Sequence, residues 1–325
     1  GPSVPSLLGG RAPSATSSSG GVSSMEEFFH QLTNGLAVGG IYALIALGYT
    51  MVYGVLRLIN FAHGDLFTLG SYLGLTLLFS LGLQGKMSGI LVGGALIVMS
   101  MGLVAVVGYL LERVAYRPLR GSNRLAAVVS ALGASIFFSN AIMLVYGARS
   151  QVYPNGILPS VAVSLLGVDI PLMRIVMFVG TVVLMLLLYW FINHTRIGTA
   201  IRAVAIDQGA ARLMGINVDR VISLVFFIGA GLGGVAGVMV GTYYGQIDFT
   251  MGWSYGLKAF TAAILGGIGN IPGAMIGGLL LGVIEALGAS YLAMAWKDAI
   301  AFLVLILILI IRPTGLLGER VADKL

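Results

Sequence analysis

Nine long runs of apolar residues follow one another along this chain and limit what it can fold into. A helix needs about 20 mainly apolar residues to cross the hydrocarbon core of a bilayer. Only 9% of the 325 residues are charged, against about a quarter in a soluble domain. We therefore predict an all-α polytopic membrane protein with eight or nine transmembrane helices. The runs cover residues 34–56, 64–82, 88–111, 126–146, 171–193, 221–244, 255–268, 272–292 and 298–312.

The count is eight or nine because the run 255–268 is short. Gly269-Asn270-Ile271-Pro272-Gly273 follows it, so it is either a short span or half of a broken helix pair. The first 24 residues are rich in Ser, Gly and Pro, and we interpret 1–24 as a disordered remnant of a cleaved tag and linker. A transmembrane domain is predicted over 25–318, and a polar tail over 319–325.

Basic residues gather in alternate loops. The loops 112–125 and 194–220 are rich in arginine, and Arg320 and Lys324 lie in the tail, whereas 245–254 has no basic residue. Loops on the cytoplasmic side carry an excess of Lys and Arg. We therefore expect both loops and the C-terminus to be cytoplasmic.

The chain offers little material for catalysis. It has no cysteine and only three histidines, His30, His63 and His194, so thiol chemistry is excluded and a metal site is not expected. No phosphate-binding Walker A motif is present, which means that any ATP and Mg²⁺ would be bound by another chain. An intramembrane enzyme needs a nucleophile with a base, paired carboxylates or metal ligands. We predict neither catalytic residues nor a cofactor.

Polar residues near the first two spans are candidates for a solute path. Asn60 and His63 lie three apart, between two apolar runs. They either line a broken element beside the path or form a tight cytoplasmic turn that caps the next helix. Tyr42, Tyr49 and Tyr53 lie on the first span, and Tyr42 and Tyr49 share a helical face because they are seven apart. A stripe of this kind either faces the path or packs in the core.

Two ionisable residues fall inside apolar runs, Lys258 and Glu285. Such groups are costly in a membrane unless they are paired, so we expect each to face protein, paired either with the other or with backbone carbonyls. Lys297-Asp298 stands at a helix boundary and is interpreted as an interfacial anchor or cap. The many glycines inside the runs, such as Gly278 and Gly282, predict close packing of helices within the subunit. The alternatives are a subunit interface or a moving seam.

Several long stretches resemble one family, the H-type permease subunit of bacterial branched-chain amino acid ABC importers (the Liv system), within the wider Liv/ribose-type permeases. The resemblance runs from about Asn34 to Gly318. It rests on Tyr42–Gly54 (YALIALGYTMVYG), Ile59–Gly64 (INFAHG), Glu112–Pro118 (ERVAYRP), Met214–Ile222 (MGINVDRVI) and Lys258–Gly269 (KAFTAAILGGIG).

The resemblance implies a transport subunit of the bacterial inner membrane. Its expected partners are an M-type permease, two cytoplasmic ATPase subunits that bind ATP and Mg²⁺, and a periplasmic amino acid-binding protein, with membrane lipid around it and no nucleic acid. The solute would pass between the two permeases. Rival hypotheses are a permease for urea or other small amides, and a stand-alone secondary transporter driven by an ion gradient.

The loop 194–220 matches the family's ATPase-docking motif, Ala-Ala-x-x-x-Gly, at Ala210, Ala211 and Gly215. The resemblance implies that a short helix here enters a cleft on the ATPase, helped by its small alanines. Gly215 is expected to end that helix in a conformation that other residues resist. Polar contacts at the rim are expected from Arg202, Asp207 and Arg212. The alternative is an ordinary amphipathic loop.

Overall fold

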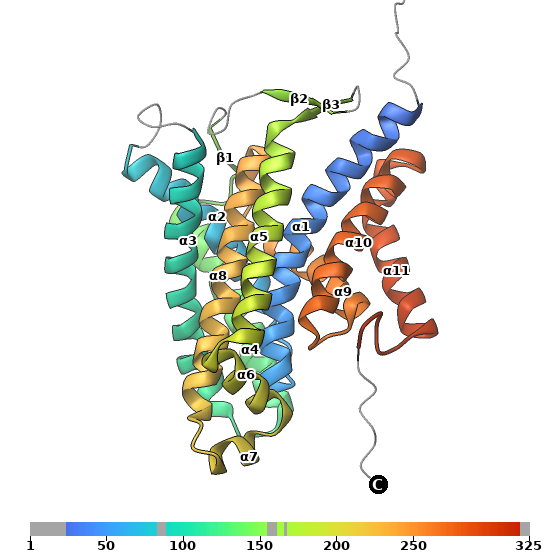
Figure 1. Ribbon diagram of the computed structural model, residues 1–325. Coiled ribbons are helices and arrows are strands. Elements are labelled where there is room, and N and C mark those ends of the chain that lie inside the picture. Colours follow the sequence, from blue (N-terminus) through green and yellow to red (C-terminus); the bar gives the residue numbers. More distant parts are fainter. Residues whose placement is uncertain (1–23, 83–88, 155–160, 166–167, 319–325) are drawn as a thin grey trace, which may run out of the picture.

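The computed structural model describes residues 24–82, 89–154, 161–165 and 168–318, and Figure 1 shows them as a bundle of long helices. The predicted tag remnant, apart from Ser24, and the tail 319–325 lie outside the described residues. The helices are α1 (Ser24–Leu56), α2 (His63–Ser80), α3 (Gly89–Leu111), α4 (Arg124–Tyr146), α5 (Leu172–His194), α6 (Arg196–Ile206), α7 (Gln208–Leu213), α8 (Val218–Tyr244), α9 (Met251–Gly266), α10 (Ile271–Tyr291) and α11 (Lys297–Ile311).

Every predicted apolar run lies on a helix, which confirms the all-helical membrane architecture. Seven of the described helices are long and apolar enough to cross a bilayer, namely α1, α3, α4, α5, α8, α10 and α11, the last together with the 3₁₀ turn Met294–Trp296 before it. The other two runs form α2, which has His63 and Asp65 in its first turn, and α9, which has 16 residues. A short π-helical turn, Glu112–Tyr116, and a 3₁₀ turn, Arg117–Leu119, extend α3.

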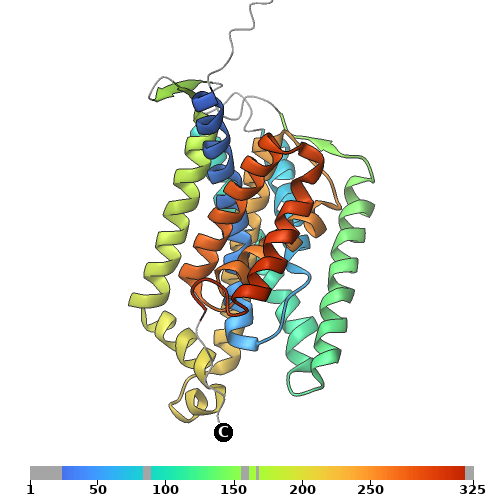
Figure 2. The ribbon, with the colours of Figure 1, turned by 90° about the vertical axis from the view of Figure 1, so that its right-hand side faces the viewer.

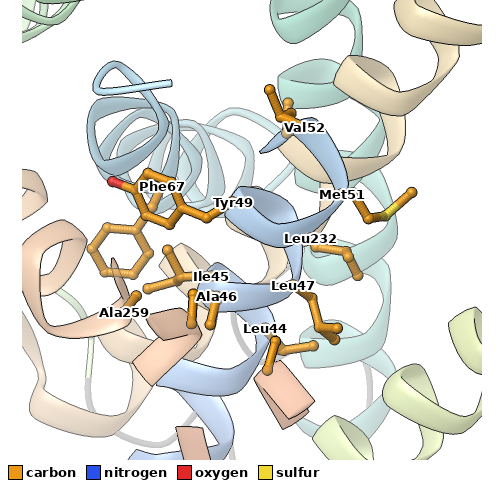
Figure 3. Close-up of a cluster of buried hydrophobic side chains, with 14 of the residues drawn as sticks. Leu44, Ile45, Ala46, Leu47, Tyr49, Met51, Val52, Phe67, Leu232 and Ala259 are labelled. Atoms are coloured by element: carbon orange, nitrogen blue, oxygen red, sulfur yellow. The ribbon is translucent and has the colours of Figure 1, made fainter. Parts of the chain in front are cut away.

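Helix α1 is the centre of the bundle. It packs against α10, α8, α9 and α5, and its residues Leu44, Ile45 and Leu47 are fully buried. Figure 3 shows these side chains between Phe67 of α2 and Leu232 of α8. By contrast, α4 and α11 present most of their surface outward, where apolar side chains suit lipid or a partner. Figure 2 shows α4 and α5 on opposite sides of the bundle.

Glycines bring α1 and α10 into backbone contact. A Cβ added to Gly282 would lie 2.2 Å from Gly39 Cα, and one added to Gly278 would lie 2.4 Å from Ala43 Cα. Close approach of this kind adds dispersion contacts, which stabilise helix pairs in lipid where the hydrophobic effect is absent. The predicted role of the Gly278–Gly282 pair in packing within the subunit is confirmed.

Four short strands were not predicted. β1 (Gln151–Val152) pairs antiparallel with β4 (Gln246–Ile247), and β2 (Ala162–Leu165) pairs antiparallel with β3 (Val168–Pro171). They lie at the end of the bundle opposite α7 (Figure 1). The prediction missed β1 and β4 because each has two residues, and the pairing joins segments about 95 positions apart, beyond the reach of any local pattern.

Candidate functional site

The segment between α5 and α8 is folded into two helices at one end of the bundle, the lowest part of the ribbon in Figure 1. α6 turns back beneath α5 at Thr195, whose Oγ1 accepts a hydrogen bond of 3.0 Å from the Gly198 amide. Arg202 then donates to the carbonyl of Ile192 and, at 3.3 Å, to Asn193 Oδ1. The Arg202 side chain therefore caps the end of α5, where cations and donors are favourable.

α6 is amphipathic and packs on the chain's own interior. Gly198, Ile201 and Val204 face inward at helical spacing. The contact with the end of α1 is polar: Gln208 Nε2 donates to Val55 O over 2.9 Å, and Arg57 Nη2 donates to Ala205 O over 3.3 Å. These bonds satisfy carbonyls at helix ends that have no partner within their own helix. α6 is therefore attached to the central helix.

α7 is a single short helix with a cap at each end. Asp207 Oδ1 accepts from the amides of Gly209 (2.7 Å) and Ala210 (3.0 Å). At the other end Gly215 has φ 83°, its amide donates to Arg212 O, and the Ile216 amide donates to Ala211 O. This pair of bonds is a Schellman motif, so Gly215 ends the helix in the way that the sequence predicted.

The surface of α7 is apolar and uncovered. Leu213 is 91% exposed, Met214 is 81% exposed, and Ile206, just before α7, is 84% exposed. Ala210, Arg212 and Gly215 are exposed beside them, whereas Ala211 is 3% exposed and packs inside its own chain. Exposed apolar groups gathered on one surface mark interaction sites. Sequence reasoning missed Ile206, Leu213 and Met214, although apolar residues in the longest polar loop were a usable signal.

The structure therefore separates the six predicted docking residues. Ala210, Arg212 and Gly215 lie on the exposed surface of the α7 turn. Arg202 and Asp207 make hydrogen bonds inside the segment and hold its shape. The small side chain of Ala211 lets α7 approach the bundle rather than a partner. Their part in docking stays a prediction.

An ionic network holds the start of α8 beside this segment. The buried carboxylate of Glu112 accepts from Ser223 Oγ at 2.6 Å and from the Arg120 guanidinium. Arg120 also bonds Asp219 at 2.7 Å, and Arg117 bonds the other oxygen of Asp219 at 3.1 Å. A buried acid with a charged partner and a hydroxyl donor is satisfied. The network therefore ties the start of α8, which follows the α6–α7 segment, to the turns that extend α3.

The polar segment between α1 and α2 is a turn at the same end of the bundle. Asn60 is buried, and its Oδ1 accepts a hydrogen bond of 2.7 Å from Tyr116. No side chain caps the first turn of α2, so the capping role considered for Asn60 and His63 is wrong. Asp65 instead accepts from Ser135 of α4. The side chains link helices rather than cap one.

The candidate path residues are mostly packed in the interior. The Tyr49 and His63 rings meet edge to face, with their centroids 4.8 Å apart. The His63 ring also packs closely on Gly48, since a Cβ added to Gly48 would lie 2.2 Å from His63 Nε2. Tyr42 faces Tyr255 of α9 at 6.0 Å. Tyr42, Tyr49, Asn60 and His63 are buried and Tyr53 is half-buried. None of the five lines any of the three cavities described below, so their part in a solute path stays a prediction.

The two ionisable residues in the apolar runs do meet. Lys258 Nζ lies 2.8 Å from Glu285 Oε1, which is one of the two expected arrangements, and 2.6 Å from Asp298 Oδ1. Lys297 Nζ lies 3.3 Å from Glu285. Lys297 begins α11, which confirms the predicted helix boundary. Two positive and two negative side chains thus join α9, α10 and α11.

Three of the cavities in the described part of the chain bear on the site. One of about 210 Å³ lies between α1, α10 and the start of α11. A second, of about 610 Å³, is an apolar groove between α3 and α4. The third, of about 320 Å³, includes Tyr244, Asp248 and Tyr255 near β4. The first is the one with side chains of both charge signs in its lining, Glu285 and Lys297.

A family model described as "Branched-chain amino acid transport system / permease component" matches residues 31–309. The chain belongs to this permease family. It is 48% identical to the high-affinity branched-chain amino acid transport system permease protein BraD of Pseudomonas aeruginosa, over 92% of this chain and 100% of that protein. It is 46% identical to LivH of Escherichia coli K12, over 91% of this chain and 97% of LivH.

A probable LivH permease from the archaeon Methanocaldococcus jannaschii is 30% identical over 88% of this chain and 91% of its own length. The predicted resemblance is therefore confirmed over nearly the whole helical bundle. The chain is a polytopic membrane permease, and the matched region, 31–309, includes both the α6–α7 segment and the Lys258–Glu285 pair.

Proposed function

We propose that this chain is a transmembrane subunit of an ATP-driven importer for branched-chain or other hydrophobic neutral amino acids. The observation that carries the proposal is likeness over nearly the full length to permeases named for that transport. The braced α6–α7 segment supports it, because a subunit without an ATP site needs a rigid surface through which a motor can act.

The expected assembly has four further components. A second, M-type permease would complete the path, two ATPase subunits would bind ATP and Mg²⁺, and a periplasmic binding protein would deliver the solute. The α7 surface, with Leu213 and Met214 exposed, is where we place the ATPase contact. Exposed apolar residues next to Arg212 suit a cleft that buries an apolar centre and leaves polar contacts at its rim.

The proposed orientation puts α7 and the C-terminus in the cytoplasm of a bacterial cell. The Arg117–Asp219 ion pair of 3.1 Å joins the two arginine-rich loops, so both lie at one end of the bundle. A single basic end is what the distribution of Lys and Arg across membranes favours on the cytoplasmic side.

Transport would then follow alternating access. ATP binding draws the two ATPases together, and each moves an α6–α7 segment. Gln208 at the start of α7 bonds Val55 of α1, and Arg57, just after α1, bonds Ala205 of α6. The movement therefore reaches the most buried helix of the bundle. The seam between the permeases opens outward to receive the amino acid and inward after hydrolysis.

Reconstituted uptake tests the proposal. Proteoliposomes with both permeases and both ATPases should take up radiolabelled L-leucine when binding protein and ATP are supplied. Uptake by this chain without ATPases, driven by a proton or sodium gradient, would establish a secondary transporter instead. ATP-dependent uptake of urea but not leucine would place the chain with carriers of small amides.

A further inference from the structure

The cavity of about 210 Å³ lies at the end of the bundle opposite α7. Its lining includes Gln31 and Asn34 from the first half of α1, and Glu285 and Ser290 from the last third of α10. Lys297 closes it at the start of α11. Figures 1 and 2 show these parts of α1, α10 and α11 together above the α9–α10 turn. We refer to it as the Glu285 cavity.

Glu285 has bonding capacity that the chain does not use. The residue is 1% exposed, and its Oε1 accepts from Lys258 at 2.8 Å. Its Oε2 is buried and forms no hydrogen bond of normal geometry among the described residues, although the Tyr42 hydroxyl lies close enough to interact with this carboxylate. Leaving a buried acceptor without a donor is unfavourable, and more so for a charged group. A donor brought by a ligand would satisfy this oxygen.

The rest of the lining has a complementary character. Lys297 is an ammonium with three N–H donors, and its ion-pair partner among the described residues is Glu285 at 3.3 Å. An anionic and a cationic group therefore lie a few ångströms apart in one wall. The lining also includes the apolar side chains of Val38, Ala286, Ala289 and Met294.

We propose that the Glu285 cavity binds the zwitterionic part of an α-amino acid during transport, an inference that rests on the proposed function. The ligand's ammonium would donate to Glu285 Oε2, and its carboxylate would accept from Lys297. An aliphatic side chain would lie against Val38, Ala286 and Met294. A simple cation is a poorer match, because Lys258 and Lys297 both lie within 3.3 Å of the Glu285 carboxylate.

The test uses the assembled four-subunit transporter in nanodiscs, without binding protein or nucleotide. Saturation-transfer NMR would report binding of L-leucine. 4-Methylpentanoate lacks the ammonium and isopentylamine lacks the carboxylate. Each should compete at least ~10-fold more weakly than L-leucine itself, because each loses one charge-assisted hydrogen bond.

Ala289→Leu fills the cavity without touching the ion pairs. It should abolish the NMR signal and lower leucine uptake at least ~10-fold, while ATP hydrolysis by the complex persists. Ala299→Leu is the matched control, because Ala299 is exposed on α11; binding and uptake should stay at the wild-type level. If the Ala289 variant does not assemble, Gln31→Leu replaces it. This change removes an amide from the lining and should likewise weaken leucine binding and uptake.

Three results would overturn the inference. Wild-type binding and uptake in Ala289→Leu would show that the cavity is not used. Competition by isopentylamine equal to that of L-leucine would show a cation site. A wild-type complex that hydrolyses ATP but transports no amino acid would contradict the proposed function itself. This measurement needs no variant, so it separates failure of the proposed function from failure of the cavity proposal.

Discussion

Truncating Leu213 should weaken the contact with the ATPase without harming the fold. Burying a leucine side chain stabilises a contact by about 1.5–3 kcal/mol, and Leu213 is 91% exposed in the free chain. Leu213→Ala removes most of that side chain, so we expect a loss of about 1–2 kcal/mol, or a ~5–30-fold higher dissociation constant. The stability of the permease itself should change by less than ~0.5 kcal/mol, because the side chain packs on nothing.

The assay immobilises the permease pair in nanodiscs on a sensor surface and titrates the ATPase subunits. Leu292→Ala is the matched control: Leu292 is 73% exposed, follows α10 at the opposite end of the bundle, and should bind the ATPases like wild type. The reasoning is refuted if Leu213→Ala binds them within about twofold of wild type, since that factor corresponds to well under 1 kcal/mol.

Three further predictions concern stability, measured by reversible unfolding in mixed micelles. Gly215→Ala should cost about 1–2 kcal/mol, because φ 83° is left-handed; equal stability would show that the turn relaxes. Gly282→Ala should cost about 1–3 kcal/mol through its contact with Gly39, and an unchanged midpoint would contradict close α1–α10 packing. Glu285→Gln should cost about 1.5–3 kcal/mol, because Lys258 keeps Asp298 as a partner. The double variant with Lys258→Met should lose less than the sum of the two single variants, and additive losses would argue against a coupled pair.

The sequence predicted the features that are determined by residues close together in the chain, such as the helices and their ends. The apolar runs predicted the helices because bilayer thickness sets their length. Gly215 predicted the end of α7 because a left-handed residue after a helix strongly favours glycine. A pairing of Lys258 with Glu285 was one of the arrangements expected from the sequence, because an isolated charge at membrane depth is costly. The participation of Asp298 depends on how α11 packs, which no local pattern encodes.

The candidate site was harder to predict for the same reason. Which face of α7 is exposed depends on how α6 packs against α1. The motif alone therefore could not predict that Ala211 is buried and Leu213 is exposed. Asn60 has a polar side chain suited to a solute path, yet it bonds Tyr116, 56 positions away. The Glu285 cavity combines residues from α1, α10 and α11, and no single stretch of sequence contains it.

Site-directed cross-linking is the most direct test of coupling through α7. The chain has no cysteine, so Leu213→Cys carries a single photoreactive label in the assembled transporter, and Leu292→Cys carries the same label at the opposite end. We predict that the label at 213 cross-links to an ATPase subunit and the label at 292 does not. An ATPase that is captured from 292, or never from 213, would contradict the account.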